Sequence, residues 1–158
     1  MSNEELISTT TRIIQDLLNH MGLEATIEYE ASMTKGNVFN INVPNPYVLI
    51  GRQGTTLHAL EVVVHQIAAK TFRGKEPFFF SLDVDDYKRK REWFLKEMAK
   101  EAVNSVKRIG KEVRLEPMPN YERRLVHAYI QDNHPDYTSE SIGLGNSRRI
   151  VIRKKTGN

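Results

Sequence analysis

The sequence of 158 residues contains no cysteine. Disulfides, thiolate metal ligands and cysteine nucleophiles are therefore excluded, and the chain has no need of an oxidising compartment. It also lacks an apolar run of membrane-spanning length, and its start, Met1-Ser2-Asn3-Glu4-Glu5, lacks the basic and apolar segments of a signal peptide. No low-complexity tract or internal repeat is visible. We expect a folded cytoplasmic protein, not inserted in a membrane, with one domain or two small ones.

Basic residues are scarce in the first half of the chain and abundant in the second. Residues 1–86 carry 6 Lys/Arg and 11 Asp/Glu, a net charge of −5, whereas residues 87–158 carry 17 and 9, a net charge of +8. Neutralisation of phosphates dominates non-specific affinity for nucleic acids. The second half is therefore expected to supply most of the long-range attraction for a polyanion, and the first half to bind through close contact.

The periodicity of apolar residues predicts three helices and three strands in residues 1–86. Ser2 and Glu5 have capping-box spacing at the start of a helix that runs to about residue 21, where Gly22 follows. Two strands near 25–30 and 39–43 are expected to form a hairpin through Lys35-Gly36-Asn37. The remaining elements are a short helix over 47–50, a strand over 78–84, and a helix over 55–70 with the buried stripe Leu57, Leu60, Val64, Ile67 and Ala68.

A glycine loop, Ile50-Gly51-Arg52-Gln53-Gly54, joins the two later helices. Glycine lacks a Cβ, so a phosphate can approach the backbone, and the free N–H groups at a helix start favour anionic oxygens. Arg52 adds a forked cation at the same place. An ordinary turn ahead of a helix has the same Gly-x-x-Gly pattern, so the surrounding elements must decide between the two interpretations.

The order helix, strand, strand, helix, Gly-x-x-Gly, helix, strand resembles a KH domain of the bacterial (type II) arrangement over about residues 1–86. The resemblance implies that a single strand of nucleic acid runs between the loop and the sheet edge, with its bases on aliphatic side chains. Candidates for this floor are Val48, Leu49, Ile50 and Leu57. The alternative is that these residues are plain core; the resemblance predicts partial exposure for some of them.

The second half, residues 87–158, is expected to fold as two helices on a small, mostly antiparallel sheet. The basic run Tyr87-Lys88-Arg89-Lys90-Arg91 opens a long helix that ends at Gly110, and this run either is a solvated helix face or touches nucleic acid. The apolar stripe predicted for this helix is Phe94, Met98, Ala102, Val106 and Ile109. The other predicted elements are a helix over 121–132 and strands near 113–115, 138–142 and 148–154, with a Gly/Ser-rich turn at 143–147.

Arg123 and His127 stand four residues apart on the predicted helix and so share one face. Arg123 can hold a phosphate in a fork, and His127 can stack on a base or donate to a phosphate oxygen. Arg149 and Arg153 are expected on the opposite face of their strand from Ile150 and Ile152. The alternative is that His127 packs under the sheet and Arg123 pairs with an acidic neighbour.

This Arg-x-x-x-His pair resembles the R-three-H domain, a single-strand nucleic-acid-binding module. The resemblance rests on Glu122-Arg123-Arg124-Leu125-Val126-His127, on Ser139, Ser141 and Gly143, and on Arg148-Arg149-Ile150-Val151-Ile152. A KH domain followed by an R-three-H domain is the arrangement of the Jag family, also called KhpB or SpoIIIJ-associated proteins, which are bacterial RNA-binding proteins. Many members carry a further N-terminal domain and a basic linker, whereas this chain begins almost at the first KH helix.

The resemblance implies a KH domain over 1–86 and an R-three-H domain over 87–158 that together bind single-stranded RNA, or single-stranded DNA. The expected function is that of an RNA chaperone or post-transcriptional regulator, and the resemblance allows a homodimer or a heterodimer with a small KH protein. The expected contacts with nucleic acid are Ile50, Gly51, Arg52, Gln53, Gly54, Arg123, Arg124, His127 and Arg149.

The sequence favours a binding protein over an enzyme. His58 and His65 lie seven residues apart on one helix, on the order of 10 Å, too far to chelate one metal unaided. A metal-dependent nuclease could use Asp83, Asp85 and Asp86, but solvation and capping of the following helix explain them more simply. We expect no catalytic residue, metal or cofactor. A protein-interaction scaffold with weak nucleic-acid binding is the alternative function, against which the two glycines and Arg52 argue.

Overall fold

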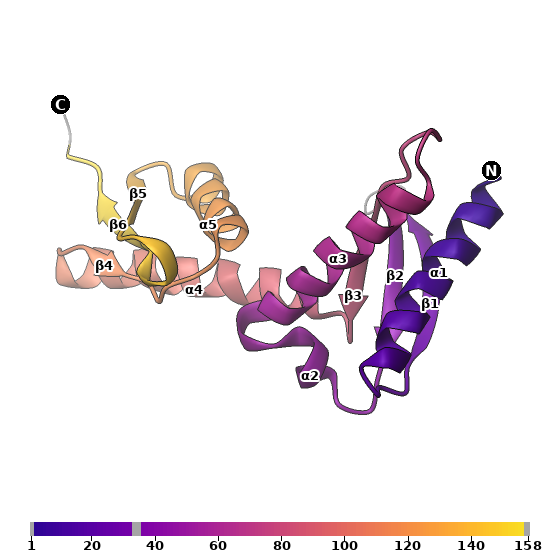
Figure 1. Ribbon diagram of the computed structural model, residues 1–158. Coiled ribbons are helices and arrows are strands. Elements are labelled where there is room, and N and C mark those ends of the chain that lie inside the picture. Colours follow the sequence, from indigo (N-terminus) through magenta and orange to yellow (C-terminus); the bar gives the residue numbers. More distant parts are fainter. Residues whose placement is uncertain (1, 33–35, 157–158) are drawn as a thin grey trace. The chain divides into compact units, whose positions relative to one another are not determined.

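The computed structural model describes residues 2–32 and 36–156, and the chain divides into two compact units, residues 1–88 and 89–158 (Figure 1). The division falls two residues beyond Asp86, where the composition changes. Each unit combines helices with a small sheet, so the predicted α+β class is confirmed. No helix in the described part of the chain is long and apolar enough to cross a membrane.

The first unit contains the elements that periodicity predicts, in the predicted order. They are α1 (Asn3–His20), β1 (Thr26–Ser32), β2 (Gly36–Asn42), α2 (Pro46–Ile50), the 3-10 turn η1 (Arg52–Gly54), α3 (Thr55–Thr71) and β3 (Phe80–Val84). The capping box of α1 is confirmed, because Ser2 Oγ accepts from the N–H of Glu5 and the Glu5 carboxylate accepts from the N–H of Ser2. Lys35, part of the predicted hairpin turn, lies outside the described residues.

The sheet of the first unit has the order β1-β2-β3. β1 and β2 pair antiparallel, as a hairpin requires, whereas β2 and β3 pair parallel because α2 and α3 connect them. α1 and α3 lie on the same face of this sheet (Figure 1). The core between them contains Ile14, Leu18, Phe39, Ile41, Leu57, Val64, Leu82 and Val84, while Ile67, at the edge of the predicted stripe of α3, is 36% exposed.

The second unit is built from most of α4 (Tyr87–Ile109), then β4 (Val113–Arg114), α5 (Asn120–Asn133), β5 (Tyr137–Ile142), the 3-10 turn η2 (Gly145–Ser147) and β6 (Arg149–Lys154). Its sheet has the order β4-β6-β5 and is antiparallel at both pairings, close to the prediction. Ile150 and Ile152 of the central strand pack with α4 and α5 in one core.

The predicted buried stripe of α4 is wrong at two positions. Phe94 and Ile109 are 48% and 53% exposed. The residues that are buried are Leu95, Ala99, Ala102, Val103 and Val106. Apolar residues extend over more of this helix than one packing face needs, so its partners determine which of them are covered.

Candidate nucleic-acid interface

The glycine loop of the first unit is a tight backbone reversal between α2 and α3. Gly51 has φ 68° and ψ −172°, and its N–H donates to the carbonyl of Tyr47 at 2.9 Å, which ends α2. Gln53 (φ 52°) and Gly54 (φ 76°) also have positive φ, and Gly54 is the N-cap of α3. Glycine adopts these angles without steric cost, whereas a left-handed conformation at Gln53 costs roughly 1–2 kcal/mol.

The missing side chains of both glycines make room for the chain's own groups. A Cβ on Gly51 would overlap the side chain of Thr56, and a Cβ on Gly54 would lie 2.6 Å from Cε1 of Tyr87. The sequence predicted that the missing Cβ atoms would let a phosphate approach the backbone. In the structure the side chains of Thr56 and Tyr87 occupy this space, so glycine is required here for packing as well as for backbone geometry.

Arg52 is the exposed residue of the loop. Its carbonyl accepts from the Thr55 hydroxyl at 2.8 Å, which holds the loop against the first turn of α3. Gln53 and Gly51 are half-buried, and Gly54 is buried. The loop therefore offers a cation at its tip.

Most of the expected aliphatic floor is core. Leu49, Ile50 and Leu57 are 0%, 7% and 1% exposed, so all three belong to the core and little of the Ile50 side chain is accessible to a ligand. Val48 alone of the four expected residues is exposed, at 48%. Its neighbour Tyr47 is 81% exposed, and the sequence interpretation did not select it although an aromatic residue so close to the loop was a usable signal.

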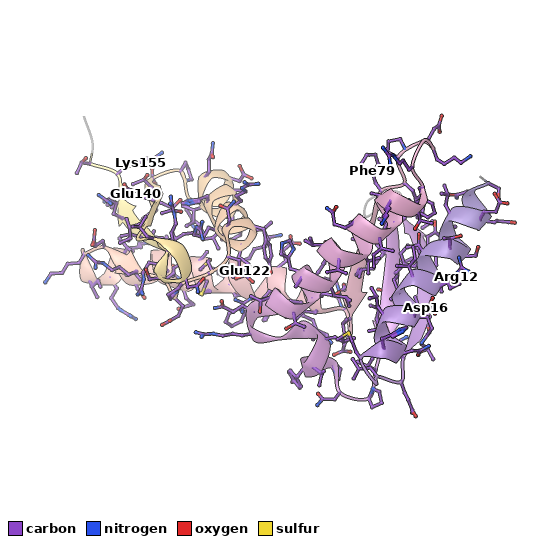
Figure 2. All side chains as sticks on the ribbon, viewed as in Figure 1. Arg12, Asp16, Phe79, Glu122, Glu140 and Lys155 are labelled. Carbon is purple, nitrogen blue, oxygen red and sulfur yellow. The ribbon has the colours of Figure 1, made fainter. Side chains whose placement is uncertain are left out.

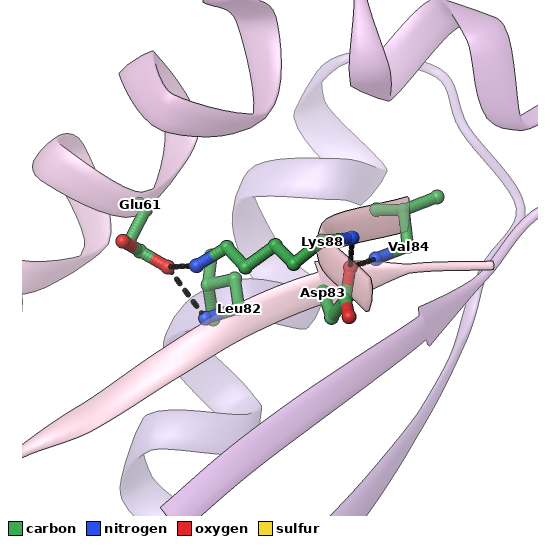
Figure 3. A network of polar contacts seen from close by, with 5 residues as sticks. All are labelled: Glu61, Leu82, Asp83, Val84 and Lys88. Carbon is green, nitrogen blue, oxygen red and sulfur yellow. Dashed lines mark hydrogen bonds and ion pairs between the residues drawn. The ribbon is translucent and has the colours of Figure 1, made fainter. Parts of the chain in front are cut away.

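The acidic end of β3 holds the start of α4 in place. Asp83 is 7% exposed, and its Oδ1 accepts from the N–H groups of Val84 at 2.8 Å and Lys88 at 3.2 Å (Figure 3). The predicted capping role is confirmed for Asp83. Burial raises the pKa of this carboxyl, while the two backbone N–H groups and then the Lys88 ammonium oppose the rise.

Glu61 of α3 reaches the same strand. Its Oε2 accepts from the N–H of Leu82 at 2.7 Å and from the Lys88 ammonium at 2.6 Å (Figure 3). The carboxylate thus occupies one backbone donor of β3 and one cation of the basic run. Lys88 is a structural contact of this unit rather than a free cation.

Arg91, the last residue of the basic run, is engaged within the second unit. Its Nε and Nη2 donate to the two carboxylate oxygens of Glu122 at 2.7 and 3.0 Å, and its guanidinium lies 5.2 Å from the ring centre of Phe94. Glu122 is fully buried. This fork joins α4 to α5, so Arg91 holds the unit together.

Arg123 is turned towards the start of its own helix. Its Nη1 donates to the carbonyl of Met118 at 2.6 Å, and its Nη2 donates to Oδ1 of Asn120 at 3.2 Å. The alternative pairing with an acidic neighbour is wrong, because the acceptors are a carbonyl and an amide. Both are neutral, so the positive charge of this half-buried guanidinium is not cancelled locally.

His127 is fixed between α5 and β5. Its Nδ1 lies 2.7 Å from Oγ of Ser139, and its Nε2 lies 2.9 Å from Oγ of Ser141. These serines pair with Ile152 and Ile150 across the sheet and share their face, so the half-buried His127 packs against the sheet. With both nitrogens occupied, the ring is oriented and has no nitrogen aimed at a phosphate.

The neutral form of His127 is favoured. Burial lowers the pKa of this imidazole from its ordinary value of 6.5, and the nearby Arg123 charge lowers it further. A neutral ring donates through one nitrogen and accepts through the other, so one serine accepts from the imidazole and the other donates to it. The strand predicted near 138–142 contains both serines, and their spacing of two on β5 puts them on one face of the sheet; the sequence interpretation did not identify them as partners of His127.

The other two arginines of the expected site differ in exposure. Arg124 is exposed on α5, whereas Arg149 is half-buried and its Nε donates to the carbonyl of Ser147 at 3.3 Å. Arg153 donates to Glu140 at 2.6 Å. Val151, which lies between the last two arginines on β6, is 1% exposed, so this sheet face is less open than the sequence alternation indicates.

The candidate metal ligands do not assemble. In residues 2–32 and 36–156, no three His, Asp or Glu side chains lie in a group that could hold a metal ion. His65 instead stacks on Phe80, with ring centres 4.1 Å apart.

Comparison with known proteins bears on both units. The family model of the R-three-H domain matches residues 94–154, which lie in the second unit. Proteins named RNA-binding protein KhpB are 31% identical over 147 residues in Lactiplantibacillus plantarum, 32% over 143 in Clostridium symbiosum and 33% over 119 in Bacillus subtilis. The alignments cover 91%, 90% and 74% of this chain, and 45%, 62% and 56% of those proteins.

The chain therefore spans about half the length of the curated relatives that it matches. Its residues 94–154 are similar to R-three-H domains, and most of its length is similar to the RNA-binding proteins named KhpB.

Proposed function

We propose that this chain is a non-catalytic, single-stranded RNA-binding protein of the Jag/KhpB type. The observation that carries the proposal is the extent of the similarity: 91% of the chain, including both units, aligns with a protein named for RNA binding. The R-three-H match in the second unit supports it independently. A bacterial RNA chaperone or post-transcriptional regulator in the cytoplasm is the role that fits this binding.

The first unit is proposed to be a KH domain of the type II arrangement. Its element order supports this, as do the sheet with one parallel pairing and the Gly51–Gly54 loop at the start of α3. In such a domain the loop clamps the sugar-phosphate backbone of about four nucleotides. Arg52 meets that backbone from the loop tip, and Val48 and Tyr47 are the exposed apolar side chains available to bases.

The second unit is proposed to hold the same strand by charge. Residues 87–158 carry a net charge of +8, against −5 for residues 1–86. Arg123, fixed by two neutral acceptors, presents a pre-oriented cation, and the exposed Arg124 adds a second one. His127 orients this region through Ser139 and Ser141, so its proposed contribution is positioning.

A titration with single-stranded RNA tests the proposal. Arg52→Asp with Gln53→Asp is expected to weaken binding at least about 10-fold, because two carboxylates at the loop repel the backbone. Arg123→Ala should weaken binding and reduce the slope of log K against log salt by about 1. The control is Arg12→Asp, which repeats the arginine-to-aspartate change of Arg52→Asp at an exposed position of α1 (Figure 2).

If the loop variant and Arg123→Ala both bind RNA like the unmodified protein, the site assignment is wrong. Single-stranded DNA of equal length, run in parallel, decides between RNA and DNA as the ligand. Sequencing of RNA crosslinked in cells identifies targets, and light scattering of the purified chain, alone and with a small KH protein, tests for a homodimer or heterodimer.

Absence of catalysis is tested separately. Labelled RNA incubated with Mg²⁺ or Mn²⁺ should remain intact, since Asp83 is committed to the backbone of Val84 and Lys88. Cleavage that Asp83→Ala abolishes would overturn the binding-only function.

A further inference from the structure

The first unit contains a second hollow, at the opposite end of α3 from the glycine loop. It has a volume of about 510 Å³ and lies between the C-terminal part of α3 and the segment that leads into β3. α3 is 17 residues long, so the two ends of this helix are roughly 25 Å apart. Figure 2 places Phe79, one of the lining residues, near the loop that follows α3.

The floor of this hollow is a group of aromatic rings. His65 stacks on Phe80 with ring centres 4.1 Å apart and planes 16° apart. Phe78 lies 5.7 Å from Phe80, and Phe72 meets Phe78 edge-on at 6.4 Å. Phe80 is 8% exposed and His65 is half-buried, so the stack runs from the core to the surface and ends at the imidazole. A further planar ring can extend it.

Small and exposed residues shape the opening. Ala68 and Ala69 line the hollow and leave room above the rings. Phe79 is 78% exposed, and its carbonyl accepts from Nδ2 of Asn37 at 2.8 Å, which ties this segment to β2. A volume of about 510 Å³ falls within the range of small-molecule binding sites, and Phe79 adds an exposed aromatic ring at its edge.

The rim is basic although the unit is acidic. Only six Lys/Arg occur in residues 1–86, and three of them, Lys70, Arg73 and Lys75, fall within six positions of the chain. Arg73 and Lys75 line the hollow, and Glu76 is the acidic member among the described residues of its lining. Aromatic rings with adjacent cations bind a nucleobase by stacking and its phosphate by charge.

We propose that this hollow, lined by His65, Phe78, Phe79 and Phe80, is a nucleobase-binding site for a nucleotide beyond those held at the glycine loop. Its role in RNA binding rests on the proposed function. A bound strand then runs along α3 from Arg52 to Arg73 and Lys75, and the affinity depends on its length.

Binding of a mononucleotide tests the site directly in the full chain. Adenosine monophosphate should shift the NMR signal of the His65 ring upfield by stacking, while ribose 5-phosphate should not. His58, exposed on the same helix seven residues earlier, is the internal reference. Equal shifts with both ligands, no shift at all, or a shift produced only by a phenylalanine-containing peptide would each overturn the proposal.

Length dependence tests whether the site belongs to the RNA path. His65→Ala and Phe79→Ala should weaken binding of a single strand of about twelve nucleotides roughly 10-fold and leave a strand of about four unchanged. Val62→Ala, exposed on α3 and outside the lining, is the matched control. Because Phe79 is exposed, its variant keeps the test valid if His65→Ala fails to fold.

The two hypotheses fail in different ways. If the Arg52/Gln53 variant loses RNA while the His65 and Phe79 variants bind the long strand normally, the proposed function stands and the second site is overturned. If the unmodified chain binds no RNA but adenosine monophosphate shifts His65, the proposed function fails and the nucleobase site stands.

Discussion

In the first unit the candidate site is a backbone loop, whereas in the second it is a set of side chains from one helix and two strands. The loop depends on left-handed angles at Gln53 and Gly54 and on the space that Gly51 and Gly54 leave for neighbouring groups. The second site depends on acceptors and donors for Arg123 and His127 that come from other parts of the unit. Substitutions therefore act on conformation in one unit and on pairing in the other.

The units also use their ion pairs differently. Glu61–Lys88 in the first unit is partly exposed, with side chains 19% and 43% exposed. In the second unit, Glu122 is fully buried and held by both arms of the Arg91 guanidinium. An exposed pair contributes about 1 kcal/mol or less, whereas breaking a buried pair leaves a desolvated charge. The connection between α4 and α5 is therefore expected to be more sensitive to loss of one charge than the Glu61–Lys88 contact is.

The largest effect is expected for Glu122→Ala. Removal of this carboxylate takes away both acceptors of the Arg91 fork in a mostly buried place, and the free energy of unfolding of the second unit should fall by about 3 kcal/mol. The matched control is Glu140→Ala, which breaks the exposed pair with Arg153 and should cost about 1 kcal/mol or less. Urea unfolding with hydrogen exchange resolved by unit measures both; equal losses would contradict the contrast drawn between buried and exposed pairs.

An intermediate effect is expected for Gly54→Ala. The alanine must keep a backbone φ near +76°, and its Cβ would lie 2.6 Å from the Tyr87 ring. We therefore expect the free energy of unfolding of the first unit to fall by about 2–3 kcal/mol. Gly74→Ala isolates the conformational part, because Gly74 has φ +80° and nothing within 4 Å of an added Cβ. Gly74→Ala should lower the free energy of unfolding by about 1 kcal/mol. If the two variants lose the same stability, contact with Tyr87 is not what requires glycine at position 54.

Local patterns in the sequence predict the elements better than they predict the contacts between them. The capping box, the glycine loop and the strand alternation are short-range signals, and the structure contains the corresponding elements. The buried face of α4 is different, because apolar residues at Phe94 and Leu95 are both compatible with a helix stripe. Packing of α4 in the unit's core selects Leu95. One residue of displacement rotates the buried face by about 100°.

The side-chain partners of the second site could not be read from spacing for the same reason. His127 meets serines 12 and 14 residues later, and Arg91 meets Glu122 31 residues later. Such pairs depend on strand register and on how the helices pack, which no short pattern encodes. The Arg-x-x-x-His spacing correctly places both side chains on one helix, but it does not say that the imidazole nitrogens are already occupied.

The smallest effect, and the one that separates the units most sharply, is their response to acid. Burial disfavours the charged form of His127 and of Asp83, so the folded-state pKa is lowered for the imidazole and raised for the carboxyl. As pH falls below the ordinary histidine value of 6.5, the unfolded chain takes up a proton before folded His127 does. The second unit should therefore lose stability until the folded pKa is passed.

For Asp83 the sign is opposite. The folded carboxyl binds a proton before the unfolded one, so this residue contributes stability to the first unit as pH falls through its raised pKa towards 3.8. Hydrogen exchange resolved by unit, followed from about pH 7 to about pH 4, measures how the free energy of unfolding of each unit changes with pH. The side chains introduced by His127→Gln and Asp83→Asn do not titrate in this pH range. Each substitution should therefore weaken the pH dependence of stability in its own unit and leave that of the other unit unchanged. A loss of stability with falling pH that persists in His127→Gln would show that another group titrates in the second unit, and burial of His127 beside Arg123 would then not account for the acid response.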